Sequence, residues 1–152
     1  MAGDEPATPT PGLGVGRPTK RRPGSAVGGL EVADPRPVLD PRTATVLGVR
    51  CTACRYPVAQ QGIPWCPVCH AAVAPDRFAA TGTAWSSTVV AIPVGVRRPP
   101  FGLAYLDLDD GPRVLVHLAG PTVVRAGTRL RITGTEHGDL VAAVDTEGQV
   151  GS

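Results

Sequence analysis

All four cysteines of the chain lie in one short segment, and their spacing is typical of a metal site. Cys51 and Cys54 form one C-x-x-C pair, Cys66 and Cys69 form a second, and eleven residues separate the two pairs. Each pair can place two sulfurs on one side of an ion, and two pairs complete the tetrahedron of thiolates that zinc accepts. The pattern therefore predicts a structural zinc site, because four thiolates leave no open position for a substrate.

Three other chemistries compete for the same cysteines. The run Cys66-Pro67-Val68-Cys69-His70 matches the attachment pattern of haem c, but that reading leaves the first cysteine pair unexplained. Iron held by the same four thiolates, as in rubredoxin, would make an electron carrier, and the spacing hardly separates iron from zinc. A redox-active dithiol is the third alternative. We favour zinc, since a ribbon with so little apolar sequence needs the roughly 10–16 kcal/mol that structural zinc contributes in small domains.

The composition limits what can surround this site. A chain of 152 residues allows one ordinary domain, or a small domain with a tail. Its 19 glycines and 17 prolines approach the level at which disorder is expected in part of a chain. Aromatic residues make up 4%, so any core must be small and aliphatic, and a net charge of +2 does not by itself require a nucleic-acid or membrane partner.

The beginning of the sequence bears on location. It has neither the basic stretch nor the apolar stretch of a secretory signal, and no apolar run approaches the ~20 residues of a membrane helix. We therefore expect a cytoplasmic protein without a membrane partner. Thiols stay reduced in that compartment, so paired C-x-x-C motifs favour a metal over a disulfide.

The sequence divides into three regions. Residues 1–43 are rich in Pro, Gly, Ala and Thr, lack any regular period, and are predicted to be a disordered tail. Residues 44–78 hold a strand-like run and the four cysteines, and we expect a zinc ribbon. Residues 79–148 alternate apolar and polar positions in short runs and carry turn signals at residues 109–112 and 136–139.

The third region predicts a small barrel. Strand patterns cover residues 82–94, 103–108, 113–118, 129–132 and 140–144. A five-stranded sheet of this size protects its edges best by closing on itself. We predict a five-stranded OB-fold barrel, with a first strand long enough to pair on both sides, and an all-β protein overall.

The order of ribbon and barrel resembles the DUF35 family, whose members join a rubredoxin-like zinc ribbon to an OB fold and associate with acyl-CoA enzymes. Besides the two cysteine pairs, three stretches carry the resemblance: Thr-Gly-Thr-Ala-Trp-Ser-Ser-Thr-Val-Val at 81–90, the Pro-Phe stretch running to an acidic-Gly turn at 100–111, and Ala-Gly-Thr-Arg-Leu at 126–130. It covers residues 46–146. Family members usually begin with an aromatic-containing helix, where this chain has its Pro/Gly-rich tail.

The resemblance implies an accessory subunit that is not an enzyme. Such a subunit sits in a hetero-oligomer beside a thiolase-fold enzyme, which is a thiolase, a lipid-transfer-type aldolase or a ketosynthase-like acyltransferase. It helps to bind acyl-CoA through the CoA or pantetheine arm and stabilises its partner. The residues agree with this reading, since the metal uses all four cysteines and leaves no nucleophilic thiol.

Four further side chains are candidates for contact with CoA or with the partner. Arg97 and Arg98 lie between the first two barrel strands, in a loop that OB folds often use for binding, and a guanidinium pair can hold phosphates. Trp85 and Phe101 could line a pantetheine groove or a partner surface. The competing interpretation is that the arginines are solvated and the aromatic rings pack in the core.

Two other functions remain as alternatives. The first is a nucleic-acid-binding protein, because zinc ribbons and OB barrels both serve that purpose and residues 17–22 form a basic run. Against it, OB folds that read single strands stack bases on strand aromatics, and the second and third predicted strands offer only Tyr105. The second alternative is a stand-alone enzyme or redox carrier with iron in the ribbon. We favour the accessory subunit over both.

Overall fold

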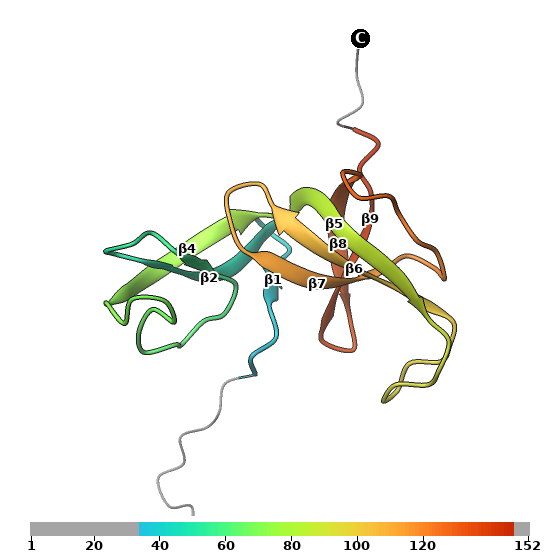
Figure 1. Cartoon of the computed structure of the whole chain (residues 1–152), viewed down its shortest axis with the longest axis horizontal. Coiled ribbons are helices and arrows are strands. Elements are labelled where there is room, and N and C mark those ends of the chain that lie inside the picture. The colour runs from blue at the N-terminus through green and yellow to red at the C-terminus, as the bar shows by residue number, and fades with distance from the viewer. Residues whose placement is uncertain (1–33, 148–152) are drawn as a thin grey trace, which may run out of the picture. The chain divides into compact units, whose positions relative to one another are not determined.

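The computed structural model describes residues 34–147, and every regular element in that part of the chain is a β-strand (Figure 1). The all-β class predicted from the sequence is therefore confirmed. Residues 1–33, most of the predicted tail, lie outside the described residues. In the described part there is also no helix with the length and apolar character that crossing a membrane requires. The strands are β1 (Val38–Asp40), β2 (Thr45–Cys51), β3 (Pro57–Val58), β4 (Val73–Ala79), β5 (Thr81–Val90), β6 (Phe101–Leu108), β7 (Arg113–Leu118), β8 (Arg129–Glu136) and β9 (Asp139–Val144).

The first four strands form an antiparallel sheet that carries the cysteines. β4 pairs with β2 along its whole length, so β1 and β3 share the other edge of β2. The first cysteine pair begins where β2 ends, and the second lies in the loop between β3 and β4. The sheet thereby places both cysteine turns at the same end of β2.

Two elements of this sheet fall where the sequence analysis expected irregular chain. β1 lies inside the range 1–43 predicted as a tail, where Asp40 faces Thr45 and accepts a hydrogen bond from Arg77 at 2.9 Å. β4 lies after the second cysteine pair, where no strand was predicted, and ends at Ala79, one residue beyond the predicted end of the ribbon. Neither strand alternates clearly in sequence, because both are defined by pairing with β2 rather than by a face of their own.

The remaining strands form a closed barrel in the order β5-β6-β7-β9-β8, which confirms the predicted five-stranded barrel. β7 and β9 run parallel, and the other pairs are antiparallel. β5 pairs with β8 at its start and with β6 along its length, and a bulge at Trp85 separates the two halves of its β6 pairing. A bulge bends a strand and increases its twist, which helps one strand to serve both neighbours.

The barrel core is aliphatic, as the scarcity of aromatic residues predicted. Alternate residues of each barrel strand point inward and are almost fully buried, among them Leu106, Leu130 and Leu140. The one large aromatic side chain of this cluster is Phe78, which comes from β4 of the ribbon. Its ring packs against Gly111 so closely that a Cβ there would lie 2.5 Å from it. Ribbon and barrel therefore share one core through Phe78.

Candidate functional site

The four cysteines come together at one end of the ribbon. Their Sγ atoms all lie within 4.8 Å of one another. Across the two pairs, the Sγ atoms of Cys51 and Cys69 are 3.4 Å apart and those of Cys54 and Cys66 are 3.7 Å apart. Four sulfurs bound tetrahedrally at about 2.3 Å from zinc would be about 3.8 Å apart. The cysteine cluster therefore has the spacing of a tetrathiolate metal site.

Backbone donors within each cysteine turn favour the thiolate form that a metal requires. The N–H groups of Ala53 and Cys54 donate to Cys51 Sγ at 3.4 Å, and the N–H of Val68 donates likewise to Cys66 Sγ. Burial raises the pKa of the Cys51 thiol, but these backbone donors, together with the Cys69 and Cys54 thiols, lower that pKa to about 6, while burial and contacts with the neighbouring thiols raise the pKa of Cys54. The Cys51 thiol therefore loses its proton readily, so the donor set fits a metal cation.

The two cysteine turns share one backbone conformation. The residue after each pair, Arg55 in the first and His70 in the second, has a positive φ of 65° and 61° respectively. This left-handed residue turns the chain sharply after the second cysteine. His70 is exposed, as expected for a residue that follows the turn, and the four sulfurs are the only donors of the cluster in the described chain.

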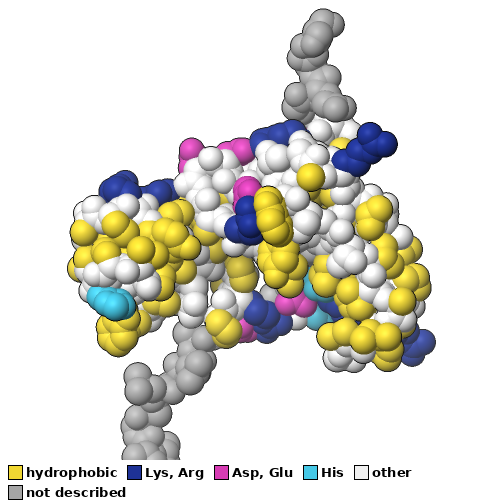
Figure 2. All heavy atoms as spheres, in the orientation of Figure 1, with side chains coloured by type: hydrophobic (Ala, Val, Ile, Leu, Met, Phe, Trp, Pro, Cys, Tyr) yellow, Lys and Arg dark blue, Asp and Glu magenta, His cyan; other side chains and the backbone are white. Residues whose placement is uncertain are grey.

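Large apolar side chains surround this end of the ribbon and remain in contact with solvent. Tyr56, Trp65 and Val68 are 47%, 57% and 59% exposed. More than half of the Trp65 surface is therefore accessible to solvent rather than packed on the ribbon. Figure 2 shows hydrophobic side chains gathered over the ribbon, at the left of the view.

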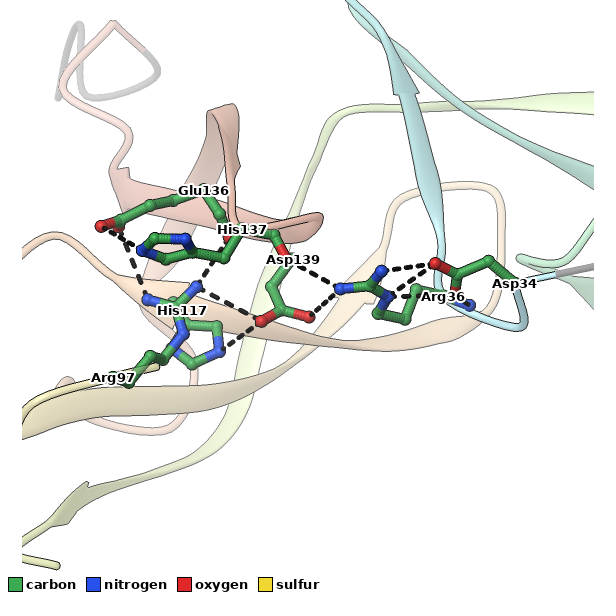
Figure 3. A network of polar contacts seen from close by, with 7 residues as sticks. All are labelled: Asp34, Arg36, Arg97, His117, Glu136, His137 and Asp139. Atoms are coloured by element: carbon green, nitrogen blue, oxygen red, sulfur yellow. Dashed lines mark hydrogen bonds and ion pairs between the residues drawn. The ribbon is translucent and has the colours of Figure 1, made fainter. Parts of the chain in front are cut away.

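Arg97, one of the two loop arginines predicted to contact CoA, lies inside a polar network (Figure 3). Its side chain is 11% exposed, and its guanidinium donates to the Glu136 carbonyl at 2.9 Å and to the Asp139 carboxylate at 3.3 Å. The same carboxylate lies 3.7 Å from Arg36 and 3.5 Å from His117 Nε2. Arg97 thus fastens the β5–β6 loop to the β8–β9 hairpin, and its charge is already balanced.

His117 connects this network to an aromatic ring. Burial and the nearby Arg97 lower the pKa of its imidazole, and Asp139 only partly opposes that shift. Its ring lies 5.6 Å from the ring of Phe101, another predicted contact residue. Its Nδ1 is buried and has no hydrogen-bond partner in the described chain. We therefore expect the His117 imidazole to be neutral at pH 7 and to line the adjacent hollow as an uncharged ring.

The other predicted contact residues lie in two different places. Arg98 is exposed and lines a hollow of about 370 Å³ together with Phe101 and His117. Trp85 is 54% exposed, with the Arg113 guanidinium 4.1 Å above its ring and Tyr105 against it edge to face at 6.2 Å. The structure therefore groups Arg98 with Phe101 and places Trp85 beside Tyr105.

The sequence analysis did not identify the apolar side chains that connect these places. Leu103, Tyr105 and Leu115 point outward from β6 and β7 and line further hollows of about 300 Å³ and 520 Å³ on the outer face of the barrel. A signal was present in the sequence, since Leu115 alternates with the core residues Val114 and Val116 and so must point away from them.

Comparison with known proteins agrees with this fold. Residues 77–135 match the family described as "ChsH2, C-terminal OB-fold domain". A solved structure named "Ltp2-ChsH2(DUF35) aldolase" is similar with a TM-score of 0.53 and 23% identity, over 68% of this chain and 87% of that chain. At that identity the structural likeness concerns the fold. No curated protein matches the sequence. The family match over the barrel and the shared fold agree with the resemblance to DUF35 proteins drawn from the sequence.

Proposed function

We propose, on the premise that this chain is a DUF35-type protein, that it is an accessory subunit which binds a thiolase-fold enzyme and the CoA or pantetheine arm of that enzyme's acyl-CoA substrate. The observation that carries the proposal is the family match over residues 77–135, in a chain that places a tetrathiolate ribbon before the barrel. The solved neighbour is named as an aldolase that includes ChsH2(DUF35), which favours an aldolase-type partner among the thiolase-fold enzymes.

The side chains of the described region support a role without catalysis. The cysteines lie together in the cluster, so none stands alone as a nucleophile. The buried imidazole of His117 contacts Asp139 and Phe101, and neither is a nucleophile that it could activate. In this proposal the partner enzyme supplies the reacting groups.

Zinc is the ion that we assign to the cysteine cluster. Cys51, Cys54, Cys66 and Cys69 would hold it with all four positions filled, so its role would be structural. It would fix the two cysteine turns and with them the apolar side chains that surround the ribbon's end.

Two exposed apolar surfaces are candidates for contact with the partner. One surrounds the cysteine turns and includes Trp65 and Val68. The other is the β5–β6 loop, where Ile92, Val94 and Val96 are 66%, 53% and 71% exposed. Monomeric proteins rarely leave large contiguous apolar patches in water, and such patches often mark interfaces.

The experiment that tests the proposal is a tagged pull-down from the native host, with captured proteins identified by mass spectrometry. We expect a thiolase-fold enzyme in stoichiometric amount. Trp65→Glu should abolish its capture, because a charge would enter the apolar surface, whereas Arg42→Glu at a side chain 88% exposed should not. Both variants should keep one equivalent of zinc by metal analysis. Capture of nucleic acid or of transcription and translation components would favour the nucleic-acid-binding alternative.

A further inference from the structure

The cysteines of the cluster differ in how far solvent can reach them. Cys51 and Cys66, the first cysteine of each turn, are fully buried, whereas Cys54 and Cys69, the second of each turn, are exposed. Both turns show the same asymmetry because they have the same spacing and the same left-handed residue after the pair. Each turn therefore keeps one cysteine inside the ribbon and presents the other to solvent.

Backbone hydrogen bonds add to the difference between the two cysteines of the first turn. Cys51 Sγ accepts from the N–H groups of Ala53 and Cys54 at 3.4 Å, whereas in the described chain the Tyr56 N–H is the one backbone donor that acts on the Cys54 sulfur. A donated hydrogen bond occupies a lone pair and makes the sulfur a weaker nucleophile. The Cys54 sulfur is thus the more accessible and the less restrained of the two.

Each exposed cysteine lies against the buried cysteine of the other turn. Cys54 Sγ is 3.7 Å from Cys66 Sγ, and Cys69 Sγ is 3.4 Å from Cys51 Sγ. An oxidised cysteine condenses with a second thiol that lies close by and forms a disulfide. The cluster therefore holds two pairs, each with an accessible sulfur and a buried sulfur in contact with it.

We propose that the cysteine cluster is a site of oxidation by peroxides, in which Cys54 and Cys69 react first and the buried sulfurs then convert them to two cross-turn disulfides. Oxidants select cysteines by thiolate character and exposure, and these two are the exposed thiolates of a metal site. A peroxide is the oxidant that we assign, because it is small and takes two electrons, the number that one disulfide releases. This chemistry needs only the ribbon, so it goes beyond the function proposed above and does not rest on it.

The atoms and electrons balance in two steps for each pair. The Cys54 thiolate attacks one oxygen of hydrogen peroxide, the O–O bond breaks, and a sulfenic acid and a hydroxide form. The Cys66 thiolate then attacks the Cys54 sulfur, the S–O bond breaks, and a second hydroxide leaves as the disulfide forms. The two sulfurs are oxidised and the peroxide is reduced. Each disulfide removes two thiolate ligands, so the cluster can no longer hold a metal.

Peroxide treatment of the zinc-loaded full chain tests this assignment cysteine by cysteine. Zinc release is followed with a chromogenic chelator, and sulfenic acids are trapped with dimedone and located by mass spectrometry. We expect zinc to be released after peroxide is added, with the first dimedone adducts on Cys54 and Cys69. Reduction with a thiol in the presence of zinc should restore one equivalent of bound metal.

Tryptic digestion without reduction identifies the disulfides. Cleavage after Arg50, Arg55 and Arg77 places the first cysteine pair in peptide 51–55 and the second in peptide 56–77. Cross-turn disulfides should leave these two peptides joined, and fragmentation should assign the links as Cys54–Cys66 and Cys51–Cys69. Disulfides within the turns would leave the peptides separate and would overturn the proposed pairing.

Histidine substitutions offer matched variants, because structural zinc also accepts sites with one or two histidines. Cys54→His should abolish the link to Cys66 and leave Cys51–Cys69 as the disulfide that forms. The double variant Cys54→His/Cys69→His, which lacks both exposed sulfurs, should keep its zinc at peroxide concentrations that strip the wild type. Ala53→Ser, at an exposed position that is not a ligand, should oxidise as the wild type does.

Two results would overturn the inference. One is a first dimedone adduct on Cys51 or Cys66, because the buried sulfurs would then be the ones that react. The other is loss of zinc from the double variant at the wild-type rate under peroxide, which would show that the exposed sulfurs are not required. If the histidine variants do not bind zinc, the adducts and disulfides of the wild type decide alone.

Discussion

The ribbon and the barrel are built from the same kind of element, yet different forces hold them. The barrel closes its sheet and buries aliphatic side chains from every strand. The ribbon buries little apart from Cys51, Cys66 and a few residues of β2, and its largest buried side chain, Phe78, belongs to the barrel's core cluster. A sheet without a core of its own needs an ion, whereas a closed sheet does not. The comparison predicts that the two regions fail under different treatments.

Removal of the metal should have the largest effect, and it should be confined to the ribbon. Cys66→Ser removes one of four ligands, and structural zinc is worth about 10–16 kcal/mol of apparent binding free energy in small zinc domains. We expect the amide resonances of residues 51–72, which hold the cysteine turns, to collapse towards random-coil positions in an NMR spectrum, while those of the barrel and of Phe78 in the shared core persist.

Ala53→Ser is the matched control, because it changes an exposed residue of the same turn that is not a ligand. It should keep one equivalent of zinc and the wild-type spectrum. A Cys66→Ser protein that still held its metal against a chelator would contradict the four-ligand assignment.

A cavity in the barrel core should destabilise the barrel and leave the ribbon unaffected. Leu106 is fully buried, and Leu106→Ala should lower the free energy of unfolding by about 2–5 kcal/mol, the range for such truncations. Urea unfolding followed by the fluorescence of Trp85 would measure this loss. Zinc release, followed with a chromogenic chelator at low urea, should stay at the wild-type rate, and early release would mean that the ribbon depends on the barrel more than its buried contacts suggest.

The junction between the two regions offers a test of their coupling. Gly111→Ala would place a methyl group 2.5 Å from the Phe78 ring, which cannot move without disturbing the shared core. Overpacking of this kind costs about 1–3 kcal/mol. We expect the barrel to unfold at a lower denaturant concentration and the ribbon to lose its zinc more readily. Gly134→Ala should change neither property, because a Cβ at Gly134 meets nothing within 4 Å.

Lowering the pH should also distinguish the two regions, but with the smallest change in the free energy of unfolding. The Arg129 guanidinium donates to Asp109 at 2.8 Å and lowers the pKa of that carboxyl. A lowered folded-state pKa means that the pair stabilises the barrel above the ordinary carboxyl pKa of about 4 and that this stability is lost as the pH falls. For a pair this exposed we expect about 0.5 kcal/mol, so Asp109→Asn should lower stability slightly at pH 7 and hardly at all at pH 2.

Asp110→Asn is the comparison variant for this measurement, because within the described residues the Asp110 side chain forms no ion pair. The ribbon should respond at higher pH, since proton competition for the thiolates releases the metal. If the barrel unfolded at the same pH as the metal left, the two regions would have to be treated as one cooperative unit.

The sequence was most informative where one strand face is buried. In β7, Val114, Val116 and Leu118 alternate with outward residues, and the pattern alone was enough to place the strand and its core face. The hairpin turn at residues 136–139 was equally readable, and His137 and Gly138 both adopt the positive φ that such a turn requires. Cysteine spacing likewise predicted that the four sulfurs come together, and their Sγ atoms lie within 4.8 Å of one another.

Long-range contacts decided what the sequence did not reveal. β1 and β4 are strands because both pair with β2. Neither has the alternating buried face that would predict a strand from the sequence. Arg97 reads as a free loop cation in sequence, and only folding brings it to Asp139, a residue 42 positions away. Trp65 reads as a core residue by its type, but the ribbon has too little core to receive it.

The parallel pairing of β7 with β9 has a consequence for biosynthesis, because β9 is the last of the described strands along the chain. The barrel cannot close before Asp139–Val144 has been made, whereas the last cysteine is residue 69. At roughly 5–20 residues per second, the metal ligands precede the closing strand by several seconds on the ribosome. The metal centre is then the first part of the molecule that can be completed and the barrel the last. In a cell short of zinc, folding of this protein would therefore be disturbed at its first step, before the closing strand β9 had been made.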